Sequence, residues 1–165
     1  LEGDLLGGYK FDAYVPDLSG GGLSASDLLL AHSITPAQDS AAATRGRLEI
    51  NVNPLQQFSV DEPLFVYFEI YRLTLDDSDQ TEYTLEYTLS PRNEEKGFFG
   101  RLFGGDDEAA LSLENTQSGP SPSPTEYAEI DIGEVDPGNY TLTVTVTDNH
   151  TGQSVQRSQD VTIHP

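Results

Sequence analysis

The chain has 165 residues, which suits one domain of ordinary size, and 36% of them are hydrophobic, enough for a single core. Its net charge of −20, from 28 acidic and 8 basic residues, argues against a nucleic-acid partner and against anionic membrane surfaces. The absence of Cys excludes disulfides and thiolate metal sites, and no apolar run is long enough to form a transmembrane segment.

Residues 1–24 are expected to form an N-terminal extension ahead of a single domain over residues 25–165. Within the extension, Tyr9 and Phe11 alternate with polar residues and predict a short edge strand. Pro16 and the glycines that follow it would end that strand. No Met is present, even at the first position, so the chain is expected to be a mature form or a part of a longer protein.

The domain is expected to open with the short apolar segment "SASDLLLAHSI". As a strand, this segment would place Leu28, Leu30 and His32 on one face. A short helix capped by Ser26 is the alternative. The strand is the preferred prediction because the apolar run is brief and ends at Pro36.

Three central segments read as strands. In "GRLEINVNP" and "TEYTLEYTLSP" the apolar residues lie on one face, whereas "PLFVYFEIYRL" is apolar on both faces, as in a strand covered on both sides. The acidic turn "DDSDQ" lies between "PLFVYFEIYRL" and "TEYTLEYTLSP", so these two strands are expected to form a hairpin. The residues expected to share the inward face are Leu48, Ile50 and Val52 in one strand and Tyr83, Leu85, Tyr87 and Leu89 in the other.

Two stretches without a strand period are expected to be excursions from the domain, at residues 91–107 and 116–125. The first contains "GFFGRLFGG", whose large apolar side chains would gather on one side of a short helical turn. We expect this group to fold back as a plug over one end of the domain, and an exposed knob that binds a protein or a lipid is the alternative. The residues of this candidate interaction knob are Phe98, Phe99, Arg101, Leu102 and Phe103.

The last part of the chain predicts four more strands, in "AALSLEN", "EYAEIDI", "GNYTLTVTVTD" and "SVQRSQDVTI". In the third of these, Tyr140, Leu142, Val144 and Val146 alternate with Thr, so one face would be core and the other wet. About seven to nine strands without an amphipathic helix predict an all-β fold, an antiparallel two-sheet immunoglobulin-like sandwich. Tyr140, just after the turn "DPGN", is the candidate for a tyrosine corner.

The chemistry-bearing residues form no recognisable catalytic motif, and we expect a protein that is not an enzyme. The three His lie in distant segments, which argues against a zinc site. The acidic turns at 76–79 and 106–108 lack a full calcium-binding loop and are interpreted as solvated turns, with calcium as the alternative. Five tyrosines suit either sheet packing or a sugar-binding face, namely Tyr67, Tyr71, Tyr83, Tyr87 and Tyr127.

A wider pattern covers residues 14–90. The phrase "SDL" at 26–28 is followed by "NP" at 53–54 and by "YFEIY" at 67–71. This order resembles the C-terminal β-sandwich region of bacterial proteins named for a Gly-Trp-x-Thr-Asp (GWxTD) motif. The naming motif is absent, and the chain has no Trp. The resemblance implies an exported or envelope-associated bacterial protein and brings no catalytic residues.

The acidic residues are scattered and Lys is scarce, which favours adaptation to high salt over an acidic binding face. We therefore expect a structural or protein-interaction module of an exported, extracytoplasmic bacterial protein, with a protein as its partner. The alternative is a carbohydrate-binding accessory domain of a larger envelope protein or enzyme, with a polysaccharide as its partner and calcium as a stabilising ion.

Overall fold

The computed structural model describes residues 21–37, 44–45, 47–92 and 109–165. These residues form two β-sheets and no helix, so the prediction of an all-β fold is confirmed. None of them belongs to a helix with the length and apolarity needed to cross a membrane. The strands are β1 (Ser24–Ala25), β2 (Leu29–Pro36), β3 (Thr44–Arg45), β4 (Leu48–Val52), β5 (Gln57–Ser59), β6 (Leu64–Tyr71), β7 (Thr81–Pro91), β8 (Leu111–Gly119), β9 (Thr125–Ile130), β10 (Gly138–Asp148) and β11 (Ser154–His164).

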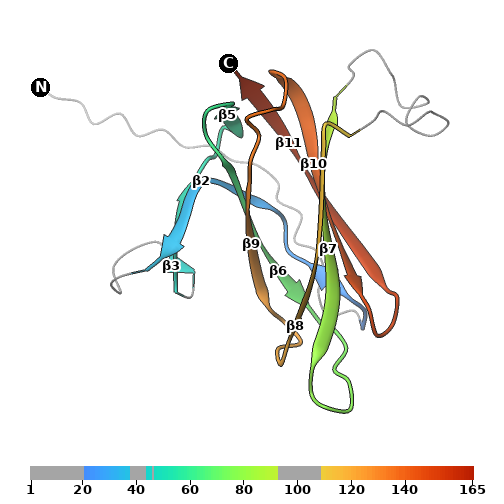
Figure 1. Ribbon diagram of the computed structural model, residues 1–165. Coiled ribbons are helices and arrows are strands. Elements are labelled where there is room, and N and C mark those ends of the chain that lie inside the picture. The colour runs from blue at the N-terminus through green and yellow to red at the C-terminus, as the bar shows by residue number, and fades with distance from the viewer. Residues whose placement is uncertain (1–20, 38–43, 46, 93–108) are drawn as a thin grey trace, which may run out of the picture.

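Each sheet has a defined strand order. The first sheet runs β9–β6–β2–β4–β3, and β1 also pairs with β6. The second sheet runs β5–β11–β10–β7–β8. The pairing of β5 with β11 is parallel, whereas the other pairs among the described strands are antiparallel. In Figure 1, β7, β10 and β11 of the second sheet lie on the right of the view, and β2 and β3 of the first lie on the left.

The two sheets pack on one apolar core, which gives the molecule a sandwich-like architecture. The alternation predicted for β7 and β10 is confirmed, because their apolar residues are buried and the threonines between those of β10 are half-buried. Full burial of each large apolar side chain contributes roughly 1.5–3 kcal/mol before entropy is counted. These buried residues are Tyr83, Leu85, Tyr87 and Leu89 in β7 and Tyr140, Leu142, Val144 and Val146 in β10.

The prediction that one strand is covered on both faces is confirmed for β6. One face of β6 contributes Val66 and Phe68 to the core between the sheets. Tyr67, on its other face, is buried in a second, smaller cluster with residues of β2 and β4. Ile50 of β4 belongs to this second cluster, but Val52 is 41% exposed, so its predicted inward position is wrong. Val52 lies where the register between β2 and β4 shifts, which ends the alternation of β4.

The strand prediction for "SASDLLLAHSI" is confirmed by β2, and the helix alternative is wrong. Leu28 and Leu30 face the main core as expected. His32 lies on the same side, since its ring centroid is 5.8 Å from that of Phe58 in the main core, but the residue is largely exposed. The register between β2 and β4 shifts at this position.

The predicted hairpin of β6 with β7 is wrong, because β6 pairs within the first sheet and β7 within the second, so the acidic turn connects the two sheets. Two boundaries also differ from the predictions. Eleven strands are present in the described residues rather than seven to nine, since β1, β3 and β5 have two or three residues each and are too short to show a period. The excursion predicted at 116–125 shrinks to residues 120–124, because β8 stays paired with β7 through Gly119. The predicted strand at Tyr9 and most of the excursion at 91–107 lie outside the described residues.

Candidate interaction site

The candidate interaction knob lies outside the described part of the chain. Phe98, Phe99, Arg101, Leu102 and Phe103 all belong to residues 93–108, which are outside the described ranges. The plug and the knob therefore both remain predictions, as does the role of the second acidic turn, which lies in the same range.

Tyr140, the candidate for a tyrosine corner, makes a hydrogen bond back to the turn that precedes β10. Its hydroxyl donates to the backbone carbonyl of Asp136, with 2.6 Å between the two oxygens. Burial, and to a lesser degree the charge of Asp136, raises the pKa of this hydroxyl, which therefore stays protonated as a donor. Gly138 lies against the same ring, since a Cβ at that position would come within 3.3 Å of a ring carbon of Tyr140. These two contacts of Tyr140, with Asp136 and with Gly138, hold the chain at the start of β10.

The five tyrosines considered for a sugar-binding face do not share one. Tyr83 and Tyr87 point into the core between the sheets. Tyr67 is buried on the opposite face of β6. There its hydroxyl and the hydroxyl of Tyr71 both donate to the carboxylate of Glu69, at 2.9 Å and 2.6 Å. Tyr127 is the direct partner of Tyr67 in the pairing of β6 with β9, so Tyr67, Tyr71 and Tyr127 share the outer face of the first sheet. Of the five tyrosines only Tyr127, with 48% of its surface exposed, is largely open to solvent, so these five rings form no exposed platform.

The acidic turn at 76–79 is held by its own backbone. The Oδ1 atom of Asp76 accepts hydrogen bonds from the backbone N–H groups of Gln80 and Ser78, at 2.9 Å and 2.8 Å. These bonds lower the pKa of the Asp76 carboxyl. Within the described ranges, no group of three or more His, Asp and Glu side chains is placed to hold a metal ion.

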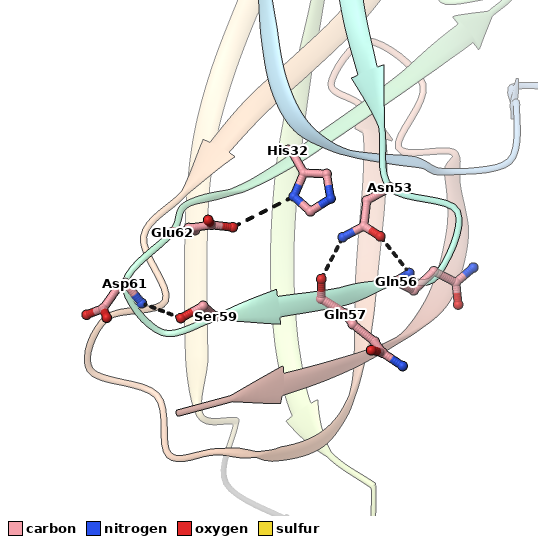
Figure 2. Close-up of polar contacts among 7 residues, drawn as sticks. All are labelled: His32, Asn53, Gln56, Gln57, Ser59, Asp61 and Glu62. Carbon is pink, nitrogen blue, oxygen red and sulfur yellow. Dashed lines mark hydrogen bonds and ion pairs between the residues drawn. The ribbon is translucent and has the colours of Figure 1, made fainter.

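Polar contacts around β5 close the turn that precedes it (Figure 2). The buried amide of Asn53 donates to the carbonyl of Gln57 at 2.7 Å and accepts from the N–H of Gln56 at 3.0 Å. Beside this turn, the Nδ1 atom of His32 lies 3.8 Å from a carboxylate oxygen of Glu62. Closure of the turn and an exposed contact between His32 and Glu62 account for these polar contacts, which form no base–nucleophile arrangement.

The open edge of the second sheet is formed by β8. This strand pairs with β7 along its whole length, from Leu111 to Gly119, without a register shift. None of the described strands pairs with its other side. Every residue from Ser112 to Ser118 is exposed. One side of this nine-residue strand therefore faces solvent.

The hydrogen-bond pattern identifies which backbone groups of β8 face solvent. The N–H of Arg92 donates to the carbonyl of Asn139 at 2.8 Å, as expected next to a non-hydrogen-bonded pair of Pro91 with Tyr140. Even-numbered residues of β7 therefore bond to β10, and odd-numbered residues bond to β8. The odd-numbered residues of β8 lie directly opposite the odd-numbered residues of β7 and form the hydrogen bonds between these two strands. The residues whose N–H and C=O groups face the open edge are Ser112, Glu114, Thr116 and Ser118.

The side chains of β8 give this edge two different faces. Glu114 lies on the outer face of the sheet, directly opposite Glu86 of β7. Leu113 points to the inner side, where it is 42% exposed. Natural edge strands are usually protected by charged side chains, above all Lys, by Pro or by a bulge. In β8, "LSLENTQSG", Glu114 is the single charged residue, Lys and Pro are absent, and the pairing with β7 shows no bulge.

Sequence reasoning missed this edge. It identified a strand in "AALSLEN" but ended it before Thr116, because the Ser- and Pro-rich stretch that follows is typical of a linker. The low charge of "LSLENTQSG" was the available signal. Which strand lies at an edge depends on the order of the strands in the sheet, which a single sequence does not display.

Neither the protein-family models nor the curated proteins compared with the chain match it. Its function is therefore inferred from its own residues.

Proposed function

We propose that the chain is a non-catalytic protein-interaction module that binds an extended segment of another protein along β8. The observation that carries this proposal is the open edge of β8, where the N–H and C=O groups of alternate residues face solvent. Addition of a strand to a sheet edge supplies main-chain hydrogen bonds and is an established mode of peptide recognition. A long unprotected edge is otherwise prone to aggregation, and a partner strand removes that hazard.

We assign the fold to the immunoglobulin-like class of sandwiches. If β6, β7, β9, β10 and β11 are taken as strands B, C, E, F and G, the pairings B–E and C–F–G of that class are reproduced. The bond from Tyr140 to the backbone of Asp136 supports the same assignment, because it lies at the start of strand F.

The resemblance to the sandwich region of GWxTD proteins supports a place for this module in an exported bacterial protein. Such modules act by the surfaces that they present, which agrees with an open sheet edge. Carbohydrate binding is not proposed, because Tyr67, Tyr83 and Tyr87 are buried and Tyr127 is the only one of the five tyrosines that offers a largely exposed ring.

A selection from random peptides tests the proposal. A phage-displayed library of random nine-residue peptides, the length of β8, is selected against the wild-type protein. Recovered peptides are then measured on Thr116→Pro and Thr116→Ala. The proline removes an N–H that faces the open edge and leaves the ladder to β7 intact, whereas the alanine leaves the backbone unchanged. We expect binding to fall at least about tenfold for the proline variant and to be unchanged for the alanine variant.

Peptides that are N-methylated at every second residue provide a second readout that does not depend on the fold of a variant. Methylation of the amides that face β8 should abolish binding, and methylation of the other set should preserve it. A library that yields no binders, or binders that are indifferent to both Thr116→Pro and N-methylation, would overturn the proposed function.

A further inference from the structure

We infer that the segment bound along β8 carries basic residues at alternate positions and apolar residues between them. This inference rests on the proposed function and assigns a chemistry to its partner. In a paired strand, alternate side chains point to opposite faces of the sheet. A partner strand would therefore present one set of side chains beside the outer face of β8 and the other set beside its inner side.

The outer face next to the open edge is negative. Glu82 and Glu86 lie on the outer face of β7, and Glu114 lies there on β8. Neither strand contains Lys or Arg, since their sequences are "TEYTLEYTLSP" and "LSLENTQSG". Arg92, just beyond β7, is already paired with Asp160 at 2.6 Å. A strand added to β8 would thus place its outward side chains beside carboxylates that have no Lys or Arg partner within the described part of the chain.

Two of these carboxylates face each other directly. Glu86 and Glu114 are partners in the register of β7 and β8, and like charges in that position destabilise a pair of strands. A Lys or Arg opposite Glu114 on an added strand would form an opposite-charge pair with it and so offset the repulsion between Glu86 and Glu114. The diagonal positions on the added strand, two residues away, point to the same outer face and lie within reach of long basic side chains.

The inner side of β8 calls for the opposite chemistry. Leu111 packs against the core between the sheets, and Leu113 is exposed next to it. An apolar side chain opposite Leu113 on an added strand would remove apolar surface from water on both strands, at about 25 cal/mol per Å². The alternation of basic and apolar residues follows from these two faces of one edge.

A second copy of the chain is the competing occupant. An antiparallel pair of β8 strands centred on Asn115 would overlap over all nine residues and place each Glu114 opposite Thr116 of the other copy. This register supplies no basic residue to the three carboxylates. It also brings together two chains that each carry a net charge of −20. Charge complementarity therefore favours a basic partner over a second copy.

Three synthetic peptides of nine residues, the length of β8, test the inference. Their cores are Lys-Val, Thr-Val and Glu-Val repeats, each with a fluorescent label, and binding to the full chain is followed by fluorescence anisotropy. We expect the Lys peptide to bind at least about tenfold more tightly than the Thr peptide, and the Glu peptide not to bind. Glu114→Lys should reverse the order of the Lys and Glu peptides, and Thr116→Pro should weaken the Lys peptide on the wild-type background.

The outcomes separate this inference from the proposed function. Equal binding of the Lys and Thr peptides would overturn the basic partner and leave strand addition intact. Binding of the Lys peptide that survives Thr116→Pro and N-methylation would show attraction to the acidic surface at large and overturn the inference. Sedimentation that shows dimers, lost in Thr116→Pro, would make a second copy the occupant and overturn it as well. Absence of binders in the random library overturns both.

Discussion

Asp148 links two connections that are far apart in the sequence. Its side chain is buried, with 1% of the residue surface exposed. One carboxylate oxygen accepts from the N–H of Thr74, at 2.8 Å, and the other accepts from the N–H groups of His150 and Thr151, at 2.9 Å and 3.1 Å. Burial alone would raise the pKa of this carboxyl, but the hydrogen bonds, led by those from Thr74, outweigh it and lower the pKa. The charged form is therefore built into the fold.

Replacement of this carboxylate should produce a pH-dependent loss of stability. Since the folded-state pKa of Asp148 lies below 3.8, its contribution is present above that value and is lost as the pH falls through the folded pKa. We expect Asp148→Asn to lower the free energy of unfolding by about 1–3 kcal/mol at neutral pH, because an amide cannot accept from all three donors. Urea unfolding at a series of pH values measures this gap.

The gap between wild type and Asp148→Asn should narrow below about pH 4, where the wild-type carboxyl takes up its proton. Asp77→Asn is the matched control, since that residue lies in the exposed acidic turn and should cause little change. A gap that stays constant as the pH falls would contradict the role assigned to the Asp148 charge.

Glu126 has the opposite electrostatic character. It projects from β9 toward the second sheet, where the hydroxyl of Tyr83 donates to its carboxylate. Burial raises the pKa of Glu126 above 4.5, and the bond from Tyr83 offsets only part of this effect. The folded state then holds the proton more tightly than the unfolded state, so stability decreases as the pH rises from about 4.5 through the folded pKa.

Glu126→Gln should therefore raise the free energy of unfolding at neutral pH, because the amide still accepts from Tyr83 and carries no charge into the core. The advantage should disappear below about pH 4, where the wild-type carboxyl is protonated in both states. Glu129→Gln, on the exposed face of the same strand, is the control. A variant less stable than wild type at neutral pH would show that the charge of Glu126 contributes to the fold.

At the scale of strands, repulsion between Glu86 and Glu114 weakens the pairing of β8 with β7. The two side chains are directly opposite on the outer face, where like charges destabilise the pairing. We expect Glu114→Lys to stabilise the chain by about 0.2–1 kcal/mol at low salt, in urea unfolding. The gain should shrink with added salt, because both side chains are solvent-exposed.

Glu114→Gln removes the repulsion from Glu86 without adding an attraction. Its free energy of unfolding should therefore lie between those of wild type and Glu114→Lys. If the lysine variant is no more stable than wild type at low salt, the like-charge pair is not a source of strain at this edge. Because the same variant is predicted to lose the basic peptide, a stabilised protein that no longer binds would also exclude misfolding as the reason for lost binding.

The elements differ in how far the sequence predicts them. The long strands β7 and β10 were predictable, because each has a regular alternation that the packed core preserves. The bulge at His32 was not, since it depends on how β2 meets β4 and leaves no mark in the local period. The candidate edge was missed for the same kind of reason: pairing with β7 extends β8 through a stretch whose composition is typical of a linker. Tyr140, by contrast, was identified from its place after a turn.

At the scale of the whole molecule, the dominant feature is the charge of −20 on 165 residues. Self-repulsion of this size destabilises a compact state, and the described residues hold few ion pairs that offset it. Salt shortens the range of this repulsion, since the Debye length falls from about 30 Å at 0.01 M to about 10 Å at 0.1 M. The hypothesis of adaptation to high salt rests on this screening, since added salt would weaken the repulsion among the acidic residues.

We expect the free energy of unfolding at neutral pH to rise as sodium chloride is increased from about 0.01 M to about 0.1 M and to continue upward toward about 1 M. The lower range is diagnostic, because screening acts there while salting-out effects on apolar surface are still small. At about pH 4 many carboxylates are protonated, the net charge is smaller, and the slope with salt should decrease. Urea unfolding at both pH values gives the two slopes. A free energy that does not change between the two lower salt concentrations at neutral pH would mean that the acidic residues are spaced widely enough to be harmless. In that case their abundance would need a different explanation from adaptation to salt.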